Sequence, residues 1–148
     1  MATVEVSFTP LATHVRTARL VATAVARRSG VPESLLEEVR LAVGEACSRA
    51  VEAHRLHCPA EPVRIALTST AGRFQVEVTD TGPAAVPAGA GASAGASGAS
   101  LPAGFGVAVI AGLADDVEIS ETATGTSIRM SWPSAITESA AVAGTAEA

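Results

Sequence analysis

The stretch Val39-Arg-Leu-Ala-Val-Gly-Glu-Ala-Cys-Ser-Arg-Ala-Val51 lies at the centre of the longest periodic segment of the chain. Its apolar residues recur every three or four positions, which is the spacing of one face of an α-helix. Pro32 suits the first turn of this helix, and Pro59 follows its expected end near His57. The sequence therefore predicts one long helix with a buried side and an exposed side.

The segments on both sides of this helix show either alternating or helical patterns of apolar residues. Besides the long helix, the predicted elements are a strand at 3–8, a helix at 11–28, paired strands at 63–68 and 74–79, a helix at 104–113, and paired strands at 117–119 and 128–132. This order predicts an α+β fold, a two-layer α/β sandwich in which a mostly antiparallel mixed sheet carries the helices on one face.

Residues 1–132 are expected to form one domain, since a chain of 148 residues has enough large apolar side chains for one core. Within it, residues 83–103 are almost only Ala, Gly, Ser and Pro. Such a segment buries too little surface to offset its ordering entropy, so we predict a mobile lid loop there. The alanine-rich stretch 133–148 is predicted to be a disordered tail.

Composition argues against several classes of function. A net charge of −5 and an aromatic content of 3% do not suit a nucleic-acid-binding protein. The chain has no apolar run long enough to span a membrane, and its first residues do not resemble a signal peptide. Two cysteines make no disulfide framework, so we expect a cytoplasmic location.

Three separated groups of residues are candidates for one site. Glu45 and Arg49 lie one turn apart on the long helix, at the rim of its apolar stripe. The stretch Asp80-Thr-Gly82 follows a strand, where a carboxylate can accept a hydrogen bond from a ligand. The stretch Gly104-Phe-Gly106 opens a helix, whose free N–H groups favour a phosphate. Each group alone is usually a surface pair, a turn or a helix entrance, and only their combination is specific.

These groups lie in four stretches that resemble the ATP-binding motifs of the anti-sigma factor serine-protein kinases, a branch of the histidine kinase-like (GHKL-type) ATPases. The stretches are Val39–Val51, Val78–Gly82, Gly104–Glu118 and Gly125-Thr126, and the resemblance extends over about residues 3–132. It is greatest to the actinobacterial regulatory type. It implies a homodimer that binds an anti-anti-sigma antagonist with a STAS domain, and a sigma factor as a second candidate partner.

The resemblance also implies a role for each matched residue. Glu45 would be the catalytic base that takes the proton from the antagonist's serine. At the adenine end of an ATP site, Asp80 would hydrogen-bond the amino group, Gly82 would allow close approach of the base, and Thr126 would lie nearby. Backbone N–H groups at Gly104 and Gly106 would contact the phosphates.

Arg49 departs from the family pattern, because the family has an asparagine there whose amide oxygen ligates Mg²⁺. A guanidinium has no acceptor lone pair and cannot coordinate a cation, so magnesium is disfavoured. Arg49 either contacts the phosphates in place of the metal or pairs with Glu45. A second departure is Pro83, where the family has glycine, and the predicted lid carries no basic residue.

We therefore expect a partner-switching regulator with a degenerate nucleotide site. The alternative is an active ATP-dependent serine kinase that phosphorylates the antagonist, with Arg49 serving the phosphates. A weaker alternative is a fragment of a sensor kinase, which the lack of a preceding dimerisation helix disfavours. His54, His57 and Cys58 do not have the spacing of a common metal site, so no metal site is predicted. The arginines at 16, 19, 27 and 28 are read as a solvated face, with an acidic partner as the alternative.

Overall fold

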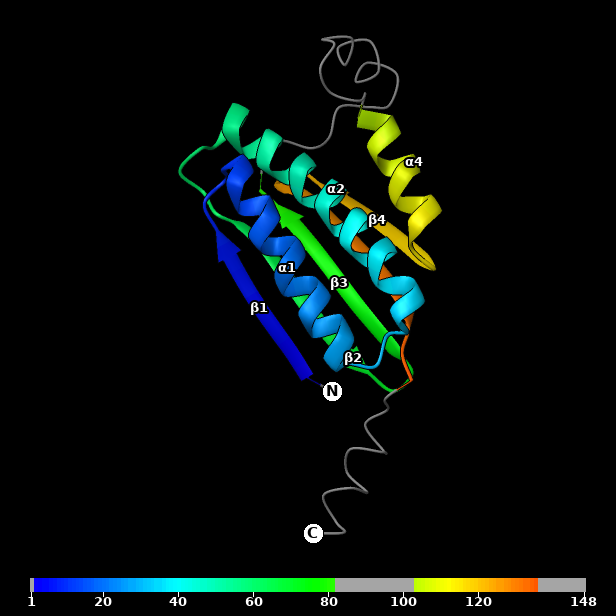
Figure 1. The fold of residues 1–148 in the computed structure, drawn as a ribbon. Helices are drawn as coiled ribbons and strands as arrows, with labels where there is room; N and C mark the ends of the chain where they lie inside the picture. Colours follow the sequence, from blue (N-terminus) through cyan, green and yellow to red (C-terminus); the bar gives the residue numbers. More distant parts are fainter. Residues whose placement is uncertain (1, 82–102, 136–148) are drawn as a thin grey trace.

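A computed structural model describes residues 2–81 and 103–135, which form two layers (Figure 1). The elements in these residues are β1 (Ala2–Phe8), α1 (Ala12–Arg28), α2 (Glu33–His57), β2 (Val63–Thr70), β3 (Arg73–Asp80), α4 (Ala103–Leu113), β4 (Asp116–Thr122) and β5 (Gly125–Pro133). The helices lie on one face of the sheet, as Figure 1 shows. The predicted α+β sandwich is confirmed, and every strand and helix expected from the sequence is present.

The five-stranded sheet of the described residues has the order β1-β2-β3-β5-β4, and all of its pairings are antiparallel. The two expected hairpins are β2 with β3 and β4 with β5. The sequence did not predict how they join. The structure pairs β3 with β5 and adds β1 to the outer edge of β2, which makes β3 the central strand.

The core lies between the helices and the inner face of the central strands. Alternate residues of β3 pair with alternate residues of β5, so Phe74 faces Trp132 and Val76 faces Met130. These four side chains are at most 1% exposed. The indole of Trp132 also donates a hydrogen bond to the Leu113 carbonyl at 3.1 Å, which satisfies a carbonyl at the end of α4.

Small residues allow α1 and α2 to pack closely. The buried side of α1 consists of Val15, Ala18, Ala22 and Ala26, spaced three or four residues apart. The side of α2 turned to α1 includes Gly44, on which the side chain of Arg19 rests. In Figure 1, α1 and α4 lie on opposite sides of α2, and both pack against it.

The edges of the fold differ from the sequence prediction in two places. The alternation at 3–8 predicts a strand with one buried face, but Val4 is 43% exposed because β1 lies at the edge of the sheet, where the helices contact it little. A hollow of about 500 Å³ lies beside β1, lined by residues of β1 and α1 that include Phe8 and His14.

At the other terminus, the amide of Ser134 donates to the Gly72 carbonyl and that of Ala135 to the Gly30 carbonyl, both at 2.9 Å.

The described fold therefore continues through residue 135, past the predicted start of the tail. The remainder of the tail (136–148) and residues 83–102 of the predicted lid lie outside the described residues. None of the helices in the described part of the chain is long and apolar enough to cross a membrane.

Candidate functional site

Asp80 and Thr126 form a polar end to the inner face of the sheet. Asp80 continues the buried alternation of β3, and Thr126 is its direct partner on β5. The two residues are 7% and 4% exposed. Asp and Thr are seldom this deeply buried, and both can hydrogen-bond a ligand, so this end of the sheet is a functional candidate. The structure thus brings together two residues that are 46 positions apart in the sequence.

Gly125 permits this pairing, because the two strand ends approach closely. A Cβ placed on Gly125 would lie 1.9 Å from the Asp80 carbonyl oxygen and 2.9 Å from the Thr81 Cα. Backbone atoms cannot move out of the way as a flexible side chain can. Only glycine therefore fits at this position without separating β5 from the end of β3.

The positions of Glu45 and Arg49 follow from the contact at Gly44. Gly44 faces α1, since a Cβ there would meet the Arg19 Cδ at 2.7 Å. Residues of an α-helix advance by about 100°, so Glu45 and Arg49 lie roughly 100° and 140° around α2 from Gly44. Both are half-buried. They are therefore on the side of α2 away from α1, where α4 packs (Figure 1).

No ion pair joins Glu45 and Arg49 among the residues that the structure describes. Of the two roles considered for Arg49, the pairing with Glu45 is therefore not seen in the described part of the chain. The two residues lie on the α4 side of α2, one helical turn apart.

The first turn of α4 contains Gly104 and Gly106, as the sequence predicted. The first four N–H groups of a helix have no acceptor within it, and they lie at the positive end of the helix dipole. Because α4 packs against α2, this turn belongs to the same side of the molecule as Glu45 and Arg49. Gly82, the remaining candidate, lies outside the described residues.

The contacts of His54, which reach the residue after Asp80, were not predicted from the sequence. Its side chain is fully buried, its Nδ1 lies 2.8 Å from the Glu61 carbonyl oxygen, and its Nε2 accepts a hydrogen bond from the Thr81 amide at 2.9 Å. Both ring nitrogens are thus engaged by protein groups. The available signal was its position, four residues after Ala50 on the apolar stripe of α2.

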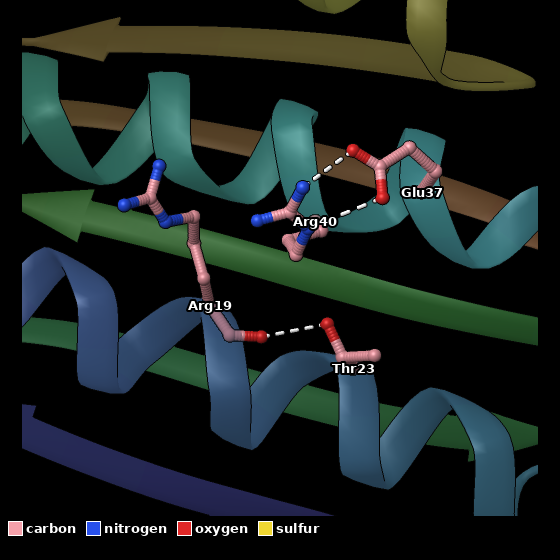
Figure 2. Close-up of polar contacts among 4 residues, drawn as sticks. All are labelled: Arg19, Thr23, Glu37 and Arg40. Atoms are coloured by element: carbon pink, nitrogen blue, oxygen red, sulfur yellow. Dashed lines mark hydrogen bonds and ion pairs between the residues drawn. The ribbon is translucent and has the colours of Figure 1, made fainter.

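The side of α2 turned to α1 carries charged side chains that contact one another or the neighbouring helix (Figure 2). There Arg19 reaches from α1 across α2, while its own carbonyl accepts a hydrogen bond from the Thr23 hydroxyl at 2.8 Å. Arg40 contacts Glu37 through two hydrogen bonds, and this bonding lowers the pKa of the Glu37 carboxyl. Arg27 contacts Glu33 at 3.1 Å. Part of the basic face of α1 is therefore used in contacts within the chain.

The two cysteines are expected to react very differently with iodoacetamide. Cys47 is buried under the helix pair, and burial raises the pKa of its thiol to about 12 despite the nearby charge of Arg19. At pH 8 its thiolate fraction would be on the order of 10⁻⁴. Cys58 is partly exposed. Mass spectrometry should find one label, on Cys58, in the folded chain and two after unfolding in guanidinium.

The variant Cys58→Ser is the matched control for this labelling and should take up no label while folded. Modification of Cys47 in that variant at the rate of an exposed thiol would contradict the packing of α1 on α2.

Comparisons with known proteins identify the family and the fold. The profile of one protein family, described as the histidine kinase-like ATPase domain, matches residues 8–132. The crystal structure of the RsbU and RsbW domains of Rv1364c from Mycobacterium tuberculosis is similar with a TM-score of 0.67 and 18% identity, over 93% of this chain and 34% of that one. The histidine kinase domain of a blue-light activated histidine kinase from Erythrobacter litoralis EL346 gives a TM-score of 0.52 and 17% identity, over 84% of this chain and 61% of that one.

A search of the curated proteins gives no match. At these low identities the two structures show a shared fold. This chain spans 34% and 61% of the chains compared, so it corresponds to a part of each.

Proposed function

Because the chain belongs to the histidine kinase-like ATPase domain family, we propose that it binds an adenine nucleotide on the α4 side of α2 and works as a partner-switching regulator. In this proposal Asp80 accepts a hydrogen bond from the adenine amino group, and Thr126 lies beside it. The phosphates lie near the first turn of α4, at the N–H groups of Gly104 and Gly106.

The observation that carries this proposal is the buried pair of Asp80 and Thr126, which ends the apolar inner face of β3 and β5. A carboxylate there can select an amino group, and the neighbouring helix end favours negative charge. These two preferences match the two ends of ATP. The family membership gives the same ligand class by an independent route.

Arg49 makes this site a degenerate one in our proposal. It lies on the side of α2 where the family ligates Mg²⁺, and its guanidinium offers donors only. A fixed cation there attracts phosphate oxygens but repels a divalent ion. Phosphoryl transfer then lacks the ion that normally neutralises charge on the transferred group. Regulation would therefore act through binding of partners.

We propose an anti-anti-sigma protein with a STAS domain as the partner, with a sigma factor as a second one, and a homodimer in the cytoplasm as the working form. Similarity in fold to a structure that contains an RsbW domain supports a regulator of this class. The exposed outer edge of β1, where Val4 is 43% exposed, is the candidate contact between two copies of the chain.

A pull-down with the tagged chain from a native lysate, followed by mass spectrometry, tests the partner class. Enrichment of a STAS-domain protein or a sigma factor over a tag-only control is the expected result, with light scattering of the purified chain giving the mass of a dimer. Recovery of neither class of protein would contradict the proposal.

One observation favours the alternative of an active serine kinase. Since no ion pair joins Glu45 to Arg49 in the described residues, the Glu45 carboxylate is not occupied by that neighbour. It is then available as the base for a serine hydroxyl. Transfer of phosphate from ATP to serine on the antagonist distinguishes this alternative from the regulator proposed above.

A further inference from the structure

The peptide that joins Asp80 to Thr81 is held from both of its sides. In a trans peptide the carbonyl and the N–H point in opposite directions. Here the Thr81 N–H donates to His54 Nε2 at 2.9 Å, while the Asp80 carbonyl oxygen abuts Gly125 so closely that a Cβ would lie 1.9 Å away. This one peptide plane is therefore fixed between the end of α2 and the start of β5.

The hydrogen bonds of His54 determine its tautomer. The Glu61 carbonyl can only accept, so Nδ1 carries the proton that it receives at 2.8 Å. The Thr81 amide can only donate, so Nε2 is unprotonated. A ring with a proton on Nε2 would set two donors against each other. The neutral Nδ1–H form is thus the one that this site requires.

We infer that His54 is a positioning residue for adenine recognition, which acts by fixing the Asp80–Thr81 peptide and thereby the aim of the Asp80 carboxylate. This inference rests on the proposed nucleotide site. The residue that follows β3 is where the chain leaves the sheet, so the β-ladder alone does not hold it. His54 supplies the missing hydrogen bond from a rigid, fully buried helix position.

Two substitutions of His54 test its hydrogen bond to the Thr81 amide, because one keeps an acceptor for that amide and the other does not. Gln reaches as far as Nε2 and offers an acceptor to the Thr81 amide, whereas Asn reaches only as far as Nδ1. We expect His54→Gln to keep the affinity for ADP, measured in EDTA by NMR shifts of the Thr81 and Thr126 amides. We expect His54→Asn to weaken ADP binding about fivefold, the equivalent of one hydrogen bond of roughly 1 kcal/mol.

The measurement that distinguishes a positioning role from a structural one is the ratio of the affinities for ADP and GDP, because it depends on the aim of the Asp80 carboxylate. The preference for ADP should fall in His54→Asn and remain in His54→Gln. Hydrogen exchange of the Thr81 amide should stay slow in His54→Gln and become faster in His54→Asn. A folded His54→Asn variant with an exposed Thr81 amide and an unchanged preference would overturn the inference, while leaving the nucleotide site intact. Absence of ADP binding by the unmodified chain at millimolar concentration would overturn the nucleotide site and the inference with it.

A measurement on the unmodified protein covers the case in which the variants do not fold. A long-range ¹H–¹⁵N spectrum should show His54 with an unprotonated Nε2 that is scalar-coupled to the Thr81 amide. A protonated Nε2 would overturn the inference.

Discussion

Replacing Gly125 with alanine is expected to lower the free energy of unfolding by about 3 kcal/mol, because the new Cβ would overlap the Asp80 carbonyl oxygen at 1.9 Å. The neighbour is backbone on the central strand, so relief requires β5 to move away from β3. That movement separates Thr126 from Asp80, and we expect nucleotide binding to be lost as well. Urea denaturation measures the first effect and an ADP titration the second.

Gly112→Ala is the matched control, because a Cβ on Gly112 meets nothing within 4 Å. Since Gly112 lies in α4, alanine there should leave stability unchanged or raise it by up to about 1 kcal/mol. Equal denaturation midpoints for Gly125→Ala and the unmodified chain would show that the strand ends do not meet as described.

Replacing Arg49 with asparagine is expected to create magnesium-dependent nucleotide binding. The substitution removes a fixed positive charge from the α4 side of α2 and supplies an amide oxygen, which is a ligand that Mg²⁺ accepts. We expect the affinity for ATP to become about ten- to hundredfold stronger in Mg²⁺ than in EDTA. Calorimetric titration in the two buffers gives this ratio directly.

Arg49→Lys serves as the control, since it keeps the cation and offers no acceptor. Its binding of ATP should not respond to Mg²⁺. If Arg49→Asn responds no more than Arg49→Lys does, the identity of residue 49 is not what weakens the metal site, and the departure at Pro83 becomes the stronger explanation.

Apolar periodicity was enough to predict every helix and strand of the described fold. Alternation in Phe74, Val76 and Val78 placed one face of β3 in the core, and the same pattern carries Asp80 to that face. Periodicity does not say which strands pair across the sheet. The contact between β3 and β5 depends on packing of the whole core, so the meeting of Asp80 with Thr126 was implied only by family resemblance.

The role of His54 could not be predicted for a related reason. Its partners are a carbonyl at Glu61 and an amide at Thr81, and backbone groups leave no mark in a sequence. Its position four residues after Ala50 is a signal for burial, but not for the use of both nitrogens. In the same way, the sequence did not indicate that the side chain of Arg19 lies against Gly44.

We propose that this chain uses a family scaffold to bind partners without magnesium-dependent phosphoryl transfer. The most direct test incubates the unmodified chain with ATP, MgCl₂ and the antagonist recovered in the pull-down, followed by mass spectrometry of the antagonist. We predict a stable complex in which the antagonist carries no phosphoserine. Phosphoserine that accumulates with time and disappears in EDTA would contradict the claim.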